Sequence, residues 1–313
     1  MVEQKAAIAM LDVPASELER VSLAFGYTLV SSTRLTGGFS SSNFRAELVP
    51  TAGGSPLTAV LKFSYAAMPR EELDHQLEIL DLLQRSAFPT NYLMPRLAAS
   101  ADATLSDRFL VTAPDGGGPW ALLVGYFDGL AGDKLLARAS AEVTHRMLHT
   151  LGATLGQLHS LPLVQQQAGR IRPLSVGFPV CNTGELLSED GAVDKLLAEV
   201  HASFAPFLQE RLHRFRTLYG ATATGLPTGF IHGDAYLDNA LFEPSEGRLL
   251  ALIDWEDSCV APFALDLAVC LSAAAFTADN ELLAERCKHV LAGYATPFHE
   301  PSMAFHHLVQ PSL

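Results

Sequence analysis

Short alternating runs of hydrophobic and polar residues dominate the first 127 positions of the chain. These runs are rich in β-branched side chains and are bounded by turn-forming residues, a pattern typical of strands. The expected strands cover residues 27–35, 44–49, 57–63, 109–112 and 121–127. Residues 50–56 hold three turn-formers and a glycine pair, which indicates a hairpin tip. We therefore expect a mainly antiparallel sheet in this part of the chain.

Two stretches of the same region have helical spacing instead. Within residues 71–84, leucines recur every three or four positions and predict one buried stripe, formed by Leu73, Leu77, Leu80 and Leu83. Near the start, Ser16 followed three residues later by Glu19 has the form of a capping box. The helix after it would turn a second set of apolar residues toward a core, namely Leu18, Val21 and Leu23.

The pattern changes after about residue 125, where longer helical periods take over. Helices are expected over residues 140–161, 186–219, 263–276 and 280–294, with short strands around a polar loop in 230–254. Residues 165–185 are punctuated by proline and glycine and predict irregular structure. A strand-rich part followed by a helix-rich part predicts an α+β fold with two lobes, residues 1–124 and 125–313.

Two pairs on the 140–161 helix need a separate interpretation. Gly152 and Gly156 are four residues apart, and they are expected to let another element pack closely. His145 and His149 share that spacing but lack the glutamate of an H-E-x-x-H zinc motif. We interpret them as surface residues.

Composition and charge exclude some classes of binding partner. The chain has 313 residues, of which 49% are hydrophobic and 18% charged, so it can bury a sizeable core and is not a disordered chain. Its formal net charge of −13 would repel nucleic acid and acidic membrane surfaces. A nucleotide such as ATP is compatible with this charge, because it needs only local cations.

The cysteines and the N-terminus predict a cytoplasmic protein. The four cysteines, Cys181, Cys259, Cys270 and Cys287, form no C-x-x-C pair, and we expect free thiols in a reducing compartment. The first twenty residues contain an early acidic residue and lack the apolar core of a signal peptide. No run reaches the roughly 18 apolar residues that a membrane-spanning helix needs.

The strongest chemical signal lies in residues 230–266. Two apolar runs, 240–242 and 249–253, flank a turn at 244–247 and predict a hairpin. That hairpin would bring Asp234 and Asn239, which precede its first strand, close to Asp254, which follows its second. Two carboxylates and an amide oxygen around one point suit Mg²⁺, a hard cation that also takes phosphate oxygens as ligands.

The spacing within this segment matches a known catalytic arrangement. His232, Asp234 and Asn239 have the H-x-D-x-x-x-x-N spacing of the protein-kinase catalytic loop, and Asp254 falls where the metal-binding aspartate follows it. We expect His232 and Asp266 to hold this loop in place. A protein kinase is disfavoured, because no A-P-E segment and too little chain for an activation loop follow Asp254.

These residues carry a resemblance to a family. The run His232-Gly233-Asp234, with Asn239, Asp254-Trp255-Glu256 and Asp266, resembles the aminoglycoside phosphotransferase and choline kinase superfamily, and within it the type II branch of homoserine kinases. Segments 37–44, 77–83, 265–271 and 291–294 are similar to that branch as well. The resemblance extends from about Tyr27 to Tyr294 and implies a bilobal protein-kinase-like fold.

The resemblance also implies a role for each matching residue. Asp234 would be the catalytic base, and Asn239 and Asp254 would hold Mg²⁺. Lys62 would contact the α- and β-phosphates of ATP, paired with Glu78, although Glu71 or Glu72 could serve instead. Further contacts to ATP are expected from two groups: Gly38, Ser40, Ser41, Ser42 and Asn43 over the phosphates, and Val124 and Tyr126 in the hinge beside adenine.

These sequence patterns say least about which molecule accepts the phosphate. The resemblance implies L-homoserine as the hydroxyl substrate, held by Asp234, Tyr236, Trp255, Glu256 and Asp257. The Trp255-Glu256-Asp257 run departs from the branch and is closer to the wider superfamily, which leaves an aminoglycoside, an amino alcohol or methylthioribose as alternatives. The tail 299–313 does not resemble the later helices of the branch, so a catalytically inactive nucleotide-binding relative is a further alternative. No oligomeric state follows from the sequence.

Overall fold

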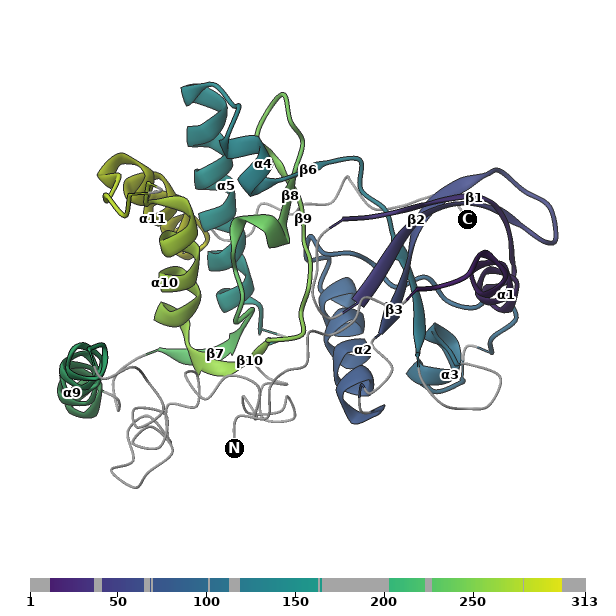
Figure 1. Cartoon of the computed structure of the whole chain (residues 1–313), viewed down its shortest axis with the longest axis horizontal. Coiled ribbons are helices and arrows are strands. Elements are labelled where there is room, and N and C mark those ends of the chain that lie inside the picture. The colour runs from purple at the N-terminus through teal and green to yellow at the C-terminus, as the bar shows by residue number, and fades with distance from the viewer. Residues whose placement is uncertain are drawn as a thin grey trace.

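The computed structural model describes residues 12–36, 41–64, 68, 70–100, 102–112, 119–162, 164, 203–222, 227–277 and 279–299. Gly38, Ser40 and Cys181 lie outside these ranges, as do the whole predicted irregular stretch 165–185 and the first part of the helical stretch 186–219. Figure 1 shows a sheet-rich part formed by the earlier residues beside a helix-rich part formed by the later ones.

A five-stranded antiparallel sheet builds the first part, in the order β1-β2-β3-β5-β4. Its strands are β1 (Tyr27–Arg34), β2 (Ser41–Pro50), β3 (Leu57–Ser64), β4 (Leu110–Val111) and β5 (Ala121–Gly125). The antiparallel sheet predicted from alternation is confirmed. The second strand begins three residues earlier than expected, at Ser41.

Helix α1 (Ala15–Phe25) covers one face of this sheet. Leu18 and Val21 are buried against it as predicted, whereas Leu23 is 57% exposed. The predicted capping box is wrong, since the helix begins directly after Pro14 and no side chain caps it. Proline has a fixed φ and needs no amide partner, so it can precede a helix start and place Ser16 inside the first turn.

Helix α2 (Arg70–Arg85) packs on the opposite face. All four leucines of its predicted stripe are buried, which confirms the helical period. A short helix, α3 (Leu105–Phe109), was not predicted. Five residues are too few to show a period, although Thr104 caps this helix by accepting a hydrogen bond from the Asp107 N–H at 3.2 Å.

The second part contains long helices and two small sheets. Its helices are α4 (Gly132–Leu136), α5 (Ala141–Ser160), α9 (Ala205–Thr222), α10 (Phe263–Ala274) and α11 (Ala284–His299). One sheet has the order β6 (Leu130–Ala131), β8 (Ala240–Phe242), β9 (Leu249–Leu252), and the other pairs β7 (Thr228–Ile231) with β10 (Cys259–Pro262). The helices expected at 140–161, 263–276 and 280–294 are confirmed, the last starting at Ala284.

Helices α5 and α11 pack closely through glycines (Figure 1). A Cβ atom at Gly152 would overlap the backbone oxygen of Val290, and one at Gly156 would overlap that of Tyr294. Gly293 meets the backbone of His149 in the same way from the other helix. The close packing predicted for Gly152 and Gly156 is therefore confirmed.

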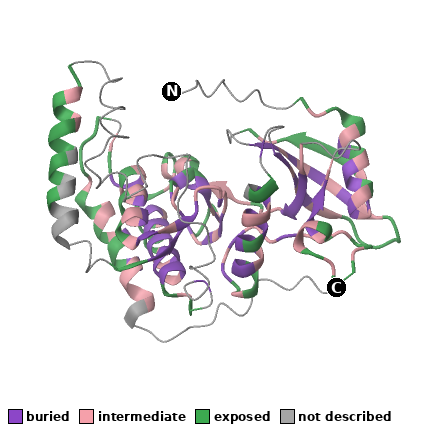
Figure 2. Ribbon diagram, turned by 90° about the horizontal axis from the view of Figure 1, so that it is seen from below, coloured by how far each residue is buried: buried purple, intermediate pink, exposed green. Residues whose placement is uncertain are grey.

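The two parts share a hydrophobic core and direct bonds. One buried cluster runs from α2 through α5 to the β8–β9 hairpin, and Figure 2 shows buried residues in both parts. The Leu252 N–H donates to the Pro89 carbonyl at 2.9 Å, and the Trp255 indole donates to the Thr90 hydroxyl at 2.8 Å. The segment after α2 is thus tied to the hairpin. A lobe boundary at residue 124 stays a prediction.

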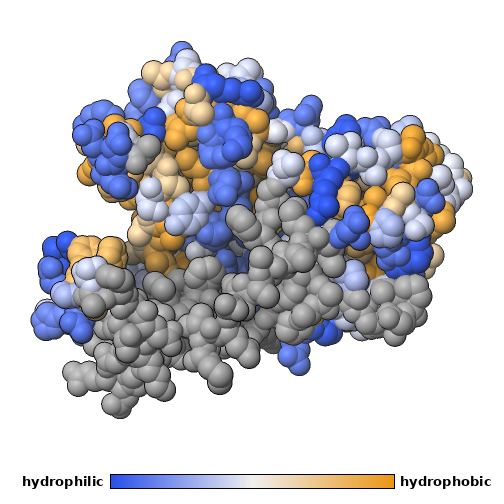
Figure 3. Space-filling view, viewed as in Figure 1, coloured by the Kyte–Doolittle hydropathy of each residue, from blue (hydrophilic) through white to orange (hydrophobic). Residues whose placement is uncertain are grey.

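The viewed face of the molecule carries both polar and apolar side chains. Figure 3 shows hydrophilic side chains over both parts of the viewed face, with hydrophobic ones between them. Among the residues that the structure describes, no helix has both the length and the apolar character to cross a membrane.

Cys259, Cys270 and Cys287 are free thiols, as expected. Burial raises the pKa of Cys270 to about 12, which keeps this thiol protonated.

Candidate active site

The predicted hairpin is present and brings its flanking residues together. Strands β8 and β9 pair antiparallel, with Ala240 opposite Leu252. One step beyond this pair, the Ile253 N–H donates to the Asn239 carbonyl at 2.9 Å. Asn239 and Asp254 therefore lie at the same end of the hairpin, as the sequence predicted.

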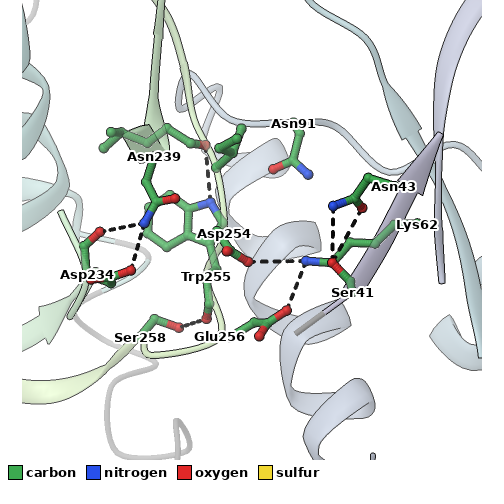
Figure 4. A network of polar contacts seen from close by, with 12 residues as sticks. Ser41, Asn43, Lys62, Asn91, Asp234, Asn239, Asp254, Trp255, Glu256 and Ser258 are labelled. Carbon is green, nitrogen blue, oxygen red and sulfur yellow. Dashed lines mark hydrogen bonds and ion pairs between the residues drawn. The ribbon is translucent and has the colours of Figure 1, made fainter. Parts of the chain in front are cut away.

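Asp234 and Asn239 are in direct contact (Figure 4). The Asn239 amide nitrogen donates to Oδ2 of Asp234 at 2.8 Å and to the Asp234 carbonyl at 2.9 Å. The amide oxygen of Asn239 consequently points away from that carboxylate. Burial raises the pKa of the half-buried Asp234 carboxyl above its ordinary value, against the smaller lowering effects of His232 and Asn239.

Two buried side chains fix the backbone that carries Asp234. Asp266 accepts hydrogen bonds from the His232 and Gly233 N–H groups, each at 2.8 Å. The His232 ring contacts the Ile253 carbonyl through Nε2 at 3.1 Å and accepts the Asp234 N–H through Nδ1 at 3.3 Å. Both residues hold the catalytic loop, in the way expected from the sequence.

Gly233 is required by this loop conformation. Its φ of +83° lies in the left-handed region, and a Cβ atom there would overlap the backbone oxygen of Asp257. Only glycine satisfies both conditions. The H-G-D order of the loop thus has a steric origin.

A buried chain of contacts extends behind Asp266. His159 of α5 lies 3.1 Å from Oδ2 of Asp266 through Nε2 and 2.9 Å from the Tyr294 hydroxyl through Nδ1. Its ring stacks on Phe263, with centroids 4.3 Å apart. Sequence reasoning missed His159 and Tyr294, because a single histidine in a leucine-rich helix gives no signal of its partners.

The carboxylates of Asp254 and Glu256, which follow β9, contact the ammonium of Lys62 on β3 (Figure 4). The Lys62 Nζ atom is 3.2 Å from Asp254 Oδ1 and 3.0 Å from Glu256 Oε1. Burial alone would lower the pKa of the Lys62 ammonium, but the two carboxylates outweigh it and raise that pKa. In turn the charge of Lys62 lowers the pKa of Asp254 against the effect of burial.

The backbone of Asp254 is strained. Its φ of +67° is left-handed, a conformation that costs a non-glycine residue on the order of 1–3 kcal/mol and recurs at functional sites. The strain directs the carboxylate toward Lys62 immediately after β9 ends.

The predicted pairing of Lys62 with Glu78 is wrong. Glu78 is exposed, since it follows the buried Leu77 by one residue and is turned about 100° around α2. Glu71 is exposed as well, and the side chain of Glu72 lies outside the description. The partners of Lys62 are instead Asp254 and Glu256, which follow the hairpin and lie 192 and 194 residues later in the chain.

The residues expected over the phosphates divide between two faces of the sheet. Asn43 is opposite Lys62 in the β2–β3 ladder, and Asn43 contacts Ser41 at 3.2 Å on that same face. Ser42 alternates to the face covered by α1, is 1% exposed and accepts a hydrogen bond from Arg34. The Ser42 hydroxyl therefore lies on the face away from Lys62, while Ser41 and Asn43 adjoin Lys62 (Figure 4). Contact of these residues with phosphate stays a prediction.

One further polar residue in this region had not been singled out. Figure 4 shows the Asn91 side chain directed into the space between Asp254 and Asn43. Its Oδ1 atom accepts a hydrogen bond from the Thr90 hydroxyl at 3.2 Å. The Thr90 hydroxyl also accepts a hydrogen bond from the Trp255 indole, and this bond joins the two parts of the molecule. Asn91 is therefore held by a residue that takes part in that connection.

The predicted acceptor residues do not form one group. Trp255 is 3% exposed and stacks on Phe230 in the core, with ring centroids 6.1 Å apart, so its prediction as a substrate contact is wrong. Glu256 is paired with Lys62 rather than free for an acceptor. Tyr236 is 43% exposed, two residues after Asp234, and remains available to a substrate.

The hinge residues lie at the end of the first sheet. Val124 is buried in β5 opposite Val60, and the next residue, Gly125, donates its N–H to the Tyr92 carbonyl at 2.9 Å. Beyond the strand, the Tyr126 ring lies under the Arg45 guanidinium, 5.2 Å from the ring centroid. Their contact with adenine stays a prediction.

The oxygen donors fit a divalent cation that shares its ligands with a substrate. Asp254 supplies a carboxylate and Asn239 an amide oxygen directed away from Asp234. The described residues contain no group of three or more histidine, cysteine or acidic side chains placed to enclose a metal. Mg²⁺ commonly binds through one or two carboxylates plus phosphate oxygens, so this donor set is sufficient for it.

Comparison with solved structures identifies the fold. The aminoglycoside phosphotransferase of Streptomyces rimosus in complex with ADP and streptomycin superposes with a TM-score of 0.55 at 17% identity, covering 91% of this chain and 92% of that one. The ethanolamine kinase of Plasmodium vivax gives 0.53 at 14% identity, covering 90% of this chain and 70% of that one. The protein-kinase-like fold is therefore confirmed.

Comparison of sequences identifies the family. The homoserine kinase of Methylorubrum populi is 33% identical over 178 residues, which are 56% of this chain and 48% of that protein. The chain thus spans about half the length of this relative. The homoserine kinase of Xanthobacter autotrophicus is 28% identical over 294 residues, 90% of this chain and 77% of that protein. The model of the phosphotransferase enzyme family matches residues 31–306, and the chain belongs to this family.

Proposed function

We propose that the protein is an ATP-dependent kinase that transfers the γ-phosphate to a hydroxyl of a small molecule, with Asp234 as the base. The observation that carries this proposal is the convergence at one end of the hairpin. Asp234 is held by Asn239 there, and Asp254 meets Lys62 from the first sheet. A base, a pair of metal-ligand oxygens and a cation for the phosphates are the parts that phosphoryl transfer needs.

Asp234 is suited to orient and deprotonate an acceptor hydroxyl. Its backbone is fixed by Asp266 and His232, so its carboxylate is preorganised. The hydroxyl oxygen would form a bond to the γ-phosphorus as the bond from the γ-phosphorus to the β-bridging oxygen breaks. The hydroxyl proton passes to Asp234, and ADP leaves.

Lys62, Asn239 and Asp254 would receive the nucleotide. Mg²⁺ bound by Asn239 and Asp254 would supply neutralisation of phosphate charge when present. The Lys62 ammonium already lies beside Asp254 and needs only to exchange one carboxylate contact for a phosphate oxygen. Ser41 and Asn43 lie on the same face and could add hydrogen bonds.

L-homoserine is the acceptor that we favour, giving O-phospho-L-homoserine. Two observations support it: the similarity to the homoserine kinases of M. populi and X. autotrophicus, and the exposed Tyr236 beside the base. An aminoglycoside, an amino alcohol or methylthioribose is the second candidate. The Trp255-Glu256-Asp257 run favours it, as this run departs from the homoserine kinase branch.

A release assay for ADP tests the proposal. Purified protein with Mg·ATP is offered L-homoserine, choline, methylthioribose and kanamycin, with Asp234→Asn as the control for contaminating kinases. We expect a rate with homoserine that the variant lacks. A rate with another acceptor alone would replace the substrate. ATP binding without turnover on any acceptor would favour an inactive nucleotide-binding relative.

A further inference from the structure

Three histidines and two arginines surround a surface hollow away from the candidate active site. The hollow has a volume of about 690 Å³ and is lined by His145, Arg146, His149, Thr150, Glu246, Arg248 and His289. These residues come from α5, from the turn between β8 and β9, and from α11. Asn239 precedes β8 and Asp254 follows β9, so this His–Arg hollow lies at the other end of the hairpin from them.

The imidazoles are arranged face to face. The rings of His145 and His289 are stacked, with centroids 4.0 Å apart and planes inclined by 19°. His149 lies one turn further along α5, on the same side as His145.

The arginines at the rim are held in position. Arg146 donates through Nε to the Glu246 carbonyl at 2.9 Å and through Nη1 to the Glu142 carboxylate. Arg248 approaches the Glu246 carboxylate, with its Nε atom 3.8 Å from Oε2. Each guanidinium has five N–H donors, so these contacts leave others for a ligand.

The lining contributes more cations than anions. Two guanidinium groups in it face one carboxylate, that of Glu246. The three imidazoles add ring nitrogens that can form hydrogen bonds with a ligand. The other charged groups around the hollow belong to its margins: Glu142 on α5, Glu243 in the turn, and Glu285 and Lys288 on α11.

We propose that the His–Arg hollow binds the phosphate group of a small soluble phosphate monoester. Such a group offers three oxygens to several donors, and guanidinium groups bind it through paired hydrogen bonds. The volume is within the usual range for small-ligand sites. A phosphate monoester loses its second proton near pH 6, so at about pH 6.5 it is present largely as the dianion. A metal ion is not favoured, since no described group of side chains is placed to hold one.

Titration of the histidine resonances tests the proposal directly. Glycerol 3-phosphate is added to the full chain at pH 6.5 and constant ionic strength, and the imidazole signals are followed by NMR. We expect saturable shifts for His145, His149 and His289 with a dissociation constant of about 1 mM or tighter. The signal of His213, which is exposed on α9, serves as the internal reference and should not move. Glycerol should cause no shift.

Two arginine variants separate specific binding from general attraction. Arg248→Gln should weaken binding roughly tenfold, whereas Arg211→Gln on α9 should leave it unchanged. Absence of saturation at pH 6.5, equal binding of succinate, or equal weakening by both arginine variants would overturn the proposal.

The phosphate of a lipid headgroup is the other source of the same chemistry. Vesicles containing phosphatidic acid are sedimented with the protein in a parallel experiment. We expect no co-sedimentation, because the net charge of −13 opposes an anionic surface. Co-sedimentation lost in Arg248→Gln, without binding of glycerol 3-phosphate, would overturn the assignment to a soluble ligand.

Discussion

At Asp234, burial and hydrogen bonding act on the same carboxylate in opposite directions. Burial raises its pKa, and the lowering effects of His232 and of the Asn239 amide partly offset this rise. The net pKa is above the ordinary aspartate value of 3.8. A base with a raised pKa accepts a proton more readily.

This environment predicts the acid side of the pH profile. Activity requires the ionised carboxylate, so kcat/KM should rise with pH through a midpoint above 3.8. Asp238 adds a small raising effect, so Asp238→Asn should move that midpoint slightly downward. Rates measured between pH 4 and 8 check this. A midpoint at or below the ordinary aspartate value would contradict the environment described for Asp234.

Lys62 illustrates a residue whose role was predicted and whose partners were not. The resemblance to the phosphotransferase superfamily implied a phosphate-binding lysine. Its ion pairs with Asp254 and Glu256 span almost two thirds of the chain, and no local pattern encodes such a contact. The resemblance also implied Glu78 as its partner, but the period of α2 turns Glu78 outward.

Removing this ammonium should destabilise the protein in a defined pH window. Lys62→Met leaves two carboxylates facing each other, at a cost of about 2 kcal/mol in the free energy of unfolding at pH 7. The lowered pKa of Asp254 means that the loss should disappear as pH falls through that pKa, and the raised pKa of Lys62 keeps it present at alkaline pH. Urea unfolding at several pH values measures the difference.

A second substitution supplies the control for this pair. Adding Glu256→Gln to Lys62→Met should recover part of the lost stability, because one unpaired charge is removed. Lys288→Met breaks the exposed pair with Glu285 and should leave stability nearly unchanged, because solvent screens an exposed ion pair. Equal losses for Lys62→Met and Lys288→Met would show that the Lys62 contacts are not stabilising.

Among the elements, length decides which could be predicted. The long helices α2, α5 and α10 gave clear periods and lie where the sequence placed them. The short elements α3, α4 and β10 were missed because so few positions cannot establish a period. The equally short strands β4, β5, β8 and β9 were predicted, since each is part of an apolar run next to a turn. Pairing partners could not be read either, since β7 joins β10 across about thirty residues.

The contact between α5 and α11 depends on glycine. Gly152→Ala would place a methyl group against the Val290 carbonyl and force the helices apart. Alanine gains about 1 kcal/mol over glycine in helix propensity, yet overpacking costs about 1–3 kcal/mol, so we expect a net loss and a lower Tm. Thermal unfolding followed by circular dichroism measures it. Gln157→Ala, at a half-exposed position on α5, should be nearly neutral; a stabilised Gly152→Ala variant would contradict the close packing.

In the whole molecule, the catalytic hairpin is the meeting point of both parts. Its residues reach the first sheet through Lys62, the segment after α2 through Thr90, and the helical core through Asp266 and His159. The motif residues Asp234, Asn239 and Asp254 could be predicted because they flank one short hairpin. Asp266 was predicted as a support of this loop, whereas Thr90 and His159 were not, because they come from segments distant in sequence.

Trp255 shows the limit of motif reading at this scale. A tryptophan beside two acidic residues resembled a substrate contact, but the fold buries its ring between Phe88 and Phe230 and engages its indole N–H with Thr90. Whether a motif residue faces the site or the core depends on how the whole hairpin is packed. The sequence alone does not contain that orientation.

The role of Asp234 is tested most directly by comparing Asp234→Asn with the unaltered protein in the ADP-release assay and in ATP binding by calorimetry. Asparagine keeps the shape of the side chain and removes the base. We predict that turnover falls roughly 10²- to 10⁴-fold while the dissociation constant for Mg·ATP changes little. Turnover near that of the unaltered protein would contradict the assignment of Asp234 as the catalytic base.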